Sequence, residues 1–169
     1  MEPTNGILQQ SKGFAITPAI TSQDLADICK LFQAYAESLG IDLSFQDFQT
    51  ELASLPGKYD ATAKGALLLA KDSNGTALGC VAVRSWSGDI CEMKRLYVAP
   101  DARGTGLGKE LANASIAQAR ILGYSKMRLD TLATMATAQK MYMQIGFREI
   151  PAYRHNPIDG TKYLELDLQ

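Results

Sequence analysis

The chain has 169 residues, the length of one ordinary domain that buries about two thirds of the surface its unfolded form exposes. Hydrophobic residues make up 46% and charged residues 21%, a balance that excludes an intrinsically disordered chain. The formal net charge of -1 excludes a broadly basic surface of the kind that binds nucleic acid. We therefore predict a single domain over residues 1–169, with residues 1–13 as a loose lead-in.

The first half of the chain predicts one strand followed by two helices. The strand is expected over residues 14–20. After Thr21, a candidate cap, apolar residues recur at steps of three and four until Gly40 ends an amphipathic helix. A shorter helix is expected after Ser44 as its cap, ending before Pro56.

The second half predicts a meander of strands and then alternating helices and strands. Asn74-Gly75 joins the apolar runs 66–72 and 77–84 and is a strong hairpin signal, and residues 85–88 turn the chain into a strand at 90–98. The later elements are expected as a helix from about Gly106 to Gly123, a strand at 126–132, a helix at 135–145, and strands at 147–150 and 163–168. The inward side chains of the helix that begins near Gly106 are predicted to be Leu107, Leu111, Ala114, Ile121 and Leu122.

These elements follow the order βααβββαβαββ. An antiparallel meander that runs into a strand–helix–strand crossover requires a mixed sheet, most of it antiparallel. The predicted fold class is therefore α+β, of the three-layer α/β type, with helices on both faces of a central sheet.

Location and metal content are predicted from what the sequence contains. Residues 1–13 show no basic start and no apolar run of signal-peptide length, and no later segment has the length and apolarity of a membrane span. Cys29, Cys80 and Cys91 are odd in number and lie in separate apolar stretches, a pattern typical of free, buried thiols in a reducing compartment. We expect a cytoplasmic protein with no membrane partner. A single histidine and dispersed cysteines predict no metal site.

The segment Arg103-Gly104-Thr105-Gly106-Leu107-Gly108-Lys109 lies between a predicted strand and the start of a predicted helix. Its alternate glycines let the backbone bend, so that successive amides converge on an anion at the positive end of the helix dipole. Arg103 and Lys109 flank the turn, and each can add a charge-assisted contact with phosphate oxygens. A pyrophosphate fits this description. The alternative is a tight loop that only begins a helix.

Two common phosphate-binding loops do not fit these residues. In a Walker loop, glycine would stand at Arg103 and serine or threonine at Glu110. In the dinucleotide pattern G-x-G-x-x-G, counted from Gly104, glycine would stand at Lys109.

The pattern that fits is R-x-x-G-x-G, with Arg103, Gly106 and Gly108 following the strand that ends at Val98. It resembles the pyrophosphate motif of the GNAT superfamily of N-acetyltransferases. The similarity extends from about residue 91 to residue 147 and includes the phrase Ala138-x-x-x-Tyr142-x-x-x-Gly146-Phe147. The resemblance implies an enzyme that transfers an acetyl group from acetyl-CoA to a primary amine.

The resemblance also implies which residues hold the cofactor. In this family the strand before the motif splays from its neighbour after a bulge, and its backbone holds the pantetheine arm. By position, the amide of Leu96 polarises the thioester carbonyl, as a fixed backbone donor does for an oxyanion, and Val98 bonds the pantetheine. The implied cofactor-binding set is Leu96, Tyr97, Val98, Arg103, Gly104, Thr105, Gly106, Leu107, Gly108 and Lys109.

Two side chains receive catalytic roles from the resemblance. Tyr142 is the expected general acid that protonates the departing thiolate, and the alternative is an ordinary core aromatic residue. Glu92 stands where the histone-acetylating branch has its catalytic glutamate, and it is the expected base. The alternative for Glu92 is a surface glutamate paired with Lys94 or Arg95.

His155 and the loop around it are further candidates. An imidazole titrates near neutrality, so His155 is an alternative base, although a solvated loop histidine is the simpler interpretation. The loop at 152–157 combines aromatic, cationic and amide groups and is expected to border the acceptor site. Met135 stands where many family members have asparagine, and Thr131 or Thr134 is a candidate helix cap in its place.

The acceptor is not identified by the sequence, and both a small-molecule amine and a protein amine stay open. Homodimerisation is common in the family and is a further expectation. A non-catalytic acyl-CoA sensor of the same fold is the alternative function, and the retention of Tyr142 and Glu92 argues against it. A general phosphate- or nucleotide-binding module is a third.

Overall fold

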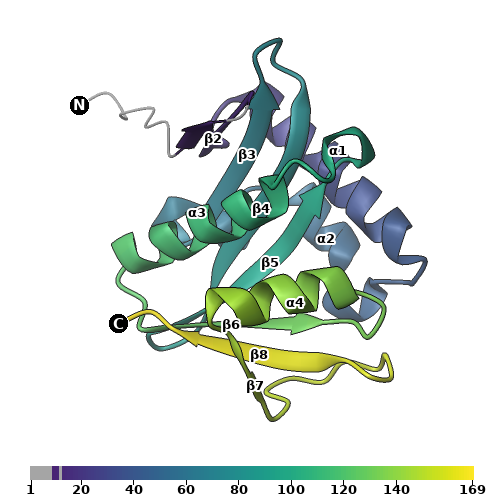
Figure 1. The fold of residues 1–169 in the computed structure, drawn as a ribbon, viewed down its shortest axis with the longest axis vertical. Helices are drawn as coiled ribbons and strands as arrows, with labels where there is room; N and C mark the ends of the chain where they lie inside the picture. The colour runs from purple at the N-terminus through teal and green to yellow at the C-terminus, as the bar shows by residue number, and fades with distance from the viewer. Residues whose placement is uncertain (1–8, 12) are drawn as a thin grey trace.

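The computed structural model describes residues 9–11 and 13–169, and Figure 1 shows how their helices and strands are arranged. The strands are β1 (Gln9–Ser11), β2 (Phe14–Pro18), β3 (Ala66–Asp72), β4 (Ala77–Ser87), β5 (Ile90–Val98), β6 (Lys126–Thr131), β7 (Arg148–Ile150) and β8 (Lys162–Asp167). The helices are α1 (Ser22–Leu39), α2 (Phe48–Ala53), α3 (Leu107–Ile121) and α4 (Ala136–Ile145). Short 3-10 turns are η1 (Ser44–Gln46), η2 (Gly57–Tyr59), η3 (Ala61–Ala63) and η4 (Pro100–Ala102).

All eight strands form one mixed sheet in the order β1-β2-β3-β4-β5-β6-β8-β7. Every neighbouring pair is antiparallel except β5 and β6, which are parallel. Helices α3 and α4 lie in front of the sheet in Figure 1, and α1 and α2 lie behind it. The predicted three-layer α+β fold, with a mostly antiparallel sheet and helices on both faces, is confirmed.

Two hydrophobic cores lie on opposite faces of the sheet because strand side chains alternate between the faces. On the face of α3, Leu107 and Leu111 pack with Val81, Val83 and Met93. The other core is formed on the face of α1 by the buried residues Ile28, Phe32, Leu67, Leu69, Cys80 and Ala82. In the first half of β5, Cys91 and Met93 belong to the first core, so the alternate positions Glu92 and Lys94 face the side of α1 and α2.

Helix α1 is fixed at both ends by its own sequence. The Thr21 side chain accepts a hydrogen bond from the amide of Asp24, and the Asp24 carboxylate accepts one from the amide of Thr21. Gly40 ends the helix with a φ of 64°, a conformation that glycine adopts without strain. The predicted cap and end of this helix are confirmed.

Three expectations for the elements are wrong. Residues 9–11 are not a loose lead-in but form β1, which pairs with β2, while residues 1–8 and 12 lie outside the described part. Ser44 does not cap the second helix: it begins η1, and α2 starts at Phe48. Residues 85–87 extend β4 rather than turning, because the turn at Gly88, with a φ of 56°, joins the strands later.

A fourth expectation fails on α3, where Ile121 is 74% exposed instead of inward. The buried face of α3 is centred on Leu111, Ser115 and Ala119, all fully buried. Two residues beyond Ala119 a helix has rotated by about 200°, so Ile121 points away from the sheet. Leu107, Leu111 and Ala114 are buried as predicted, and Leu122 packs partly buried against the core.

The three cysteines are free in the structure. Cys80 and Cys91 are buried, whereas Cys29 is only half-buried. Burial raises the pKa of the Cys91 thiol to about 12, because a thiolate is poorly solvated among apolar groups. Among residues 9–11 and 13–169, no helix combines the length and apolarity needed to cross a bilayer, and no three His, Cys, Asp or Glu side chains are placed to share a metal ion.

Candidate functional site

Strand β5 departs from regular pairing at Arg95. Cys80 of β4 pairs with Tyr97 and Ala82 pairs with Lys94, so β5 carries one residue more than β4 between these pairs. This extra residue is a β-bulge. Arg95 has a φ of 59°, in the left-handed region that residues other than glycine seldom adopt. The Cys80 thiol donates a hydrogen bond to the Arg95 carbonyl across the bulge, at 3.3 Å.

The bulge lies where β5 separates from β6. The two strands pair only from Ile90–Lys126 to Glu92–Arg128, and in Figure 1 they diverge beyond that point. A cavity of about 40 Å³ opens beside the separating strands, and Leu96 lines it. The other lining residues are Tyr35, Gln46, Met93, Lys94, Arg95, Leu129, Asp130, Thr131, Met135 and Tyr142. The expected splay after a bulge is therefore present, and we call this space the strand cavity.

Tyr142 reaches the strand cavity from α4. Its ring is buried and packs edge-to-face on Phe147, with ring centroids 5.6 Å apart. Burial raises the pKa of the Tyr142 hydroxyl, with smaller contributions from Tyr35 and Asp130, so the hydroxyl keeps its proton at neutral pH. Tyr142 is thus a core aromatic residue whose side chain also lines the cavity.

The Arg95 side chain is 2% exposed and contacts both polar groups and aromatic rings. Its guanidinium donates to both carboxylate oxygens of Glu51, at 2.9 and 3.1 Å, and to the Gln46 amide oxygen at 2.8 Å. It also lies against the rings of Tyr35 and Phe48, 5.7 and 5.2 Å from their centroids. These contacts tie the bulge to the segment that contains η1 and α2.

Lys94 is a candidate functional residue that the sequence analysis did not single out. Its side chain is 5% exposed, lines the strand cavity and donates to the Gln46 amide oxygen at 2.9 Å. Burial, followed by repulsion from Arg95, lowers the pKa of the Lys94 ammonium to about 8. The available signal was the alternation in β5, which places Glu92 and Lys94 on one face of a strand whose other face is apolar.

Glu92 is fully buried, so the alternative of a surface glutamate is wrong. Its carboxylate accepts hydrogen bonds from the Tyr153 hydroxyl at 2.6 Å and from the Arg154 guanidinium at 3.1 and 3.2 Å. The Lys94 ammonium lies 3.9 Å from it, whereas Arg95 pairs with Glu51 instead. Glu92 is not among the residues that line the strand cavity.

The loop at 152–157 lies against this side of the sheet. Tyr153 and Arg154 bind Glu92, and the Asn156 amide donates to Asp130, a lining residue of the strand cavity, at 3.1 Å. His155 is exposed, in agreement with the simpler interpretation of a solvated loop histidine. The loop thereby borders the cavity through Asn156 rather than through its histidine.

The glycine turn at 103–109 begins directly beyond β5 and η4. Gly104 and Gly106 have φ values of 79° and 85°, and Gly106 is the residue at which α3 begins. Within the described part of the chain, the backbone amides from Gly104 to Lys109 donate no hydrogen bond. Their unused donors lie at the positive end of a 15-residue helix, where an anion is stabilised.

The side chains around the glycine turn take different positions. Arg103 folds back, donating through Nε to the Val98 carbonyl at 3.1 Å with its guanidinium 5.8 Å from the Tyr97 ring centroid. Leu107 is buried in the core, so only its backbone can face a ligand. Lys109 is exposed. An anion at the turn can therefore bind to backbone amides, and the exposed Lys109 side chain is a cation beside them.

Helix α4 begins without the expected threonine cap. Met135 precedes its first residue, and no side chain caps the helix. The Thr131 hydroxyl donates instead to the Met135 sulfur, at 3.7 Å. Met135 therefore lines the strand cavity with a thioether at the position where many family members have asparagine.

Comparison with known proteins places this geometry in a family. Residues 25–147 match the model of the GNAT acetyltransferase family. An uncharacterized N-acetyltransferase of Schizosaccharomyces pombe is 42% identical over 162 residues, which cover 95% of this chain and 99% of that protein.

Two solved structures share the fold. One, described as an acyl-CoA N-acyltransferase of Klebsiella pneumoniae, superposes with a TM-score of 0.72 and 28% identity, covering 92% of this chain and 98% of that one. The other, a Salmonella typhimurium protein described as an acetyltransferase, was solved with its cofactor acetyl-CoA; its TM-score is 0.70 at 19% identity, covering 94% of this chain and 95% of that one. The family match spans most of the sequence, and the fold agrees with it over nearly the whole chain. The chain therefore belongs to the GNAT family and is an acetyl-CoA dependent acyltransferase.

Proposed function

We propose that the protein transfers the acetyl group of acetyl-CoA directly to a primary amine, with Tyr142 as the general acid. The observation that carries this proposal is the shared lining of the strand cavity: Leu96, directly after the bulge, and Tyr142 border the same space. The glycine turn lies just beyond the end of the same strand. Pyrophosphate at the turn would then lay the pantetheine arm along β5 toward Leu96.

In the proposed reaction the neutral amine nitrogen attacks the thioester carbonyl carbon. The carbonyl electrons move to oxygen, and the Leu96 amide donates a hydrogen bond to the resulting oxyanion. When the intermediate collapses, the carbon–sulfur bond breaks and the Tyr142 hydroxyl gives its proton to the thiolate. The extra proton on the former amine nitrogen leaves through water and restores the tyrosine hydroxyl, so the amide product is neutral. The place of Tyr142 beside Leu96 in the strand cavity supports its role as the acid, and burial keeps the hydroxyl protonated until the thiolate forms.

Glu92 is the proposed base that takes the proton from the acceptor ammonium. Because Glu92 does not line the cavity, the proton passes through water or through the hydroxyl of Tyr153, which is hydrogen-bonded to the carboxylate at 2.6 Å. Lys94 is a second candidate base, since it lines the cavity itself and the pKa of its ammonium lies at about 8.

Two more distant relatives are named for reactions with different acceptors. Among more distant relatives, an N-acetylaspartate synthetase of Rattus norvegicus is 27% identical, and an aminoglycoside N(6')-acetyltransferase of Klebsiella aerogenes is 31% identical. The names describe an acidic product and a polycationic acceptor. For this chain, the choice between an acidic and a polycationic acceptor is made below from the structure.

Calorimetry with acetyl-CoA, followed by a thiol-release assay with a panel of amines, tests the proposal. We expect Tyr142→Phe to lower turnover by about 10²-fold to 10⁴-fold while the affinity for acetyl-CoA stays unchanged. Tyr124→Phe is the matched control, because the Tyr124 hydroxyl donates to the Lys64 carbonyl and Tyr124 is not among the residues that line the strand cavity.

Each failed outcome has a separate meaning. Unchanged turnover in Tyr142→Phe removes the acid role. Acetyl-CoA binding without thiol release to any amine supports the non-catalytic sensor instead. A titration with no heat of binding removes the proposal altogether.

A further inference from the structure

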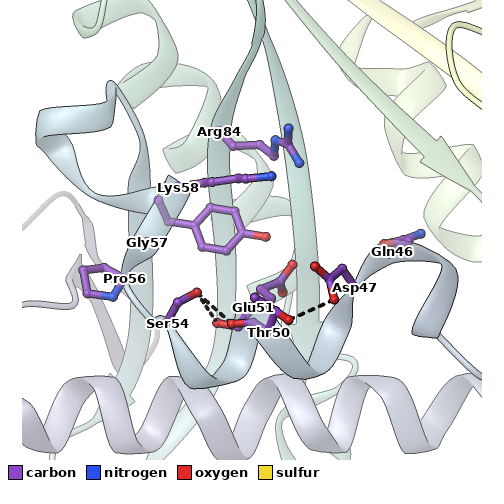
Figure 2. Close-up of a pocket in the computed structure, with 10 residues that line it drawn as sticks. Gln46, Asp47, Thr50, Glu51, Ser54, Pro56, Gly57, Lys58 and Arg84 are labelled. Atoms are coloured by element: carbon purple, nitrogen blue, oxygen red, sulfur yellow. Dashed lines mark hydrogen bonds between the residues drawn. The ribbon is translucent and has the colours of Figure 1, made fainter.

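A second cavity, of about 130 Å³, lies beside α2 and next to the strand cavity. Figure 2 shows it between the segment that includes α2 and η2 and the Arg84 side chain from β4. Gln46 lines both cavities, and its amide oxygen is held by Lys94 and Arg95 from the side of the strand cavity. The two cavities are therefore neighbours on either side of Gln46. We call this second space the α2 cavity.

Two cations face the α2 cavity. In Figure 2 the side chains of Lys58 and Arg84 run alongside each other, with their nitrogen atoms at the same end. No carboxylate lies within 4 Å of either among residues 9–11 and 13–169. The polar contact of Arg84 is a long one, from Nε to the Ser85 carbonyl at 3.3 Å, and its guanidinium lies over the Trp86 ring at 5.9 Å. Most of its donors thus remain available to a ligand.

The two acids of the α2 cavity offset these cations only in part. Glu51 is engaged by Arg95, which grips both of its carboxylate oxygens from behind the cavity wall. Asp47 accepts a hydrogen bond from the Thr50 hydroxyl at 2.9 Å. Arg95 neutralises Glu51. The charges that remain at the wall are the positive ones of Lys58 and Arg84 and the negative one of Asp47, so their sum is positive.

Tyr59 lines the same wall as a buried, neutral phenol hydrogen-bonded to Glu51. Burial, followed by the nearby Glu51 carboxylate, raises the pKa of the Tyr59 hydroxyl, so it stays protonated. The guanidinium of Arg84 and the ammonium of Lys58 are the donors that can recognise a carboxylate here, and the planar guanidinium matches its two oxygens.

We propose that the α2 cavity binds a carboxylate of the acceptor, so that the substrates are small amines that also carry an acidic group, such as free amino acids. This inference rests on the proposed acetyl transfer and names its substrate class. The carboxylate binds Arg84 and Lys58, and the amine of the same molecule reaches past Gln46 to the thioester. Polycationic acceptors are disfavoured, because they would bring further positive charge to this wall.

Matched acceptors test the proposal in the full-length protein. The thiol-release assay compares each of the twenty free amino acids with its amide, which lacks the carboxylate charge, and with a polyamine. We expect kcat/KM to be at least about tenfold higher for the free acid of the preferred pair than for its amide, since a charged hydrogen bond is lost. Equal use of acid and amide, or preference for the polyamine, overturns the inference while leaving the acetyl transfer intact.

Variants of the cavity residues test whether the preference for the free acid arises at the α2 cavity. We expect Arg84→Gln and Lys58→Gln each to raise KM for the free acid about tenfold, with kcat and the kinetics of the amide unchanged. Lys30→Gln, which removes a positive charge from the exposed face of α1, is the control and should change neither.

Arg84→Lys covers the case in which Arg84→Gln folds poorly, because it keeps the charge and should keep part of the preference. If both cavity variants discriminate acid from amide as the wild type does, carboxylate binding at Arg84 and Lys58 is wrong. If no amine releases thiol although acetyl-CoA binds, the proposed function itself fails, and this inference fails with it.

Discussion

The glycine turn and the charged network at the β5 bulge are built in opposite ways. The turn consists of consecutive residues, 103–109, whose shape comes from glycines with positive φ and from the start of α3. The network joins Arg95 to Glu51, 44 positions earlier, and Glu92 to Arg154, 62 positions later. The first is encoded locally, whereas the second exists only when the whole chain has folded.

This contrast separates two kinds of sensitivity. A local turn tolerates changes elsewhere, but it depends on the φ values of its own glycines. A buried network fails when any one partner is lost, because an unpaired charge is left in a poorly solvated place. The predictions below damage one region while sparing the other.

The largest effect is expected from Arg95→Met. Removing one partner of a buried ion pair typically costs about 3–5 kcal/mol, and here it leaves the Glu51 carboxylate, 16% exposed, without its cation. Chemical denaturation should show a loss of this size in the free energy of unfolding. The control is Lys71→Met, which breaks the more exposed Lys71–Asp24 pair and should cost about 1 kcal/mol or less. Equal losses in the two variants would contradict a special role for the bulge network.

Glu92→Gln tests whether the charged network contributes to catalysis. As a base, Glu92 contributes about 10²-fold or more to turnover, so the variant should lose this factor in kcat together with the limb of the pH–rate profile that reports the base. Lys94→Met is measured beside it. A profile that shifts only in Lys94→Met would transfer the role of base to Lys94.

Gly106→Val tests the local region. A side chain at a φ of 85° is strained by roughly 1–2 kcal/mol, so the affinity for acetyl-CoA should fall about tenfold as the turn adjusts. The KM for acetyl-pantetheine, which lacks the pyrophosphate, should not change. Gly123→Val is the control, because Gly123 has a similar φ of 89°, an added Cβ there meets open space, and it lies at the other end of α3. A parallel loss with acetyl-pantetheine would mean that the turn does not hold the pyrophosphate.

The smallest effect concerns Asp24, which lies outside both regions. Burial raises the pKa of its carboxyl, but hydrogen bonds from Lys71 and from the amides of Ile20 and Thr21 outweigh it and lower the pKa from 3.8 to about 2. Because the folded pKa is the lower one, the stabilisation is present above pH 4 and disappears as the pH falls from about 4 to 2. Discounted for solvent, this amounts to about 1 kcal/mol. Comparing the acid denaturation of wild type and Asp24→Asn measures it, and identical curves would refute it.

The sequence by itself determined the features whose causes lie within a few neighbouring residues. The Thr21 cap, the Asn74-Gly75 hairpin and the glycine turn follow from local hydrogen bonding and from glycine's access to positive φ. The order of the elements and the three-layer fold followed from apolar periodicity, since each amphipathic face must be covered. The start of α2 was missed because Ser44 is an equally plausible local cap.

Only the tertiary structure decided the charged site. A Glu-x-Lys-Arg stretch in a strand predicts surface side chains, because isolated charges are rarely buried. Here Glu92, Lys94 and Arg95 are buried, since Tyr153, Arg154, Gln46 and Glu51 come from distant parts of the chain to satisfy them. Burial of a charge depends on partners that no local pattern reveals. The family resemblance implied the bulge and the splay of β5, but the buried network and the two cavities could be recognised only in the folded chain.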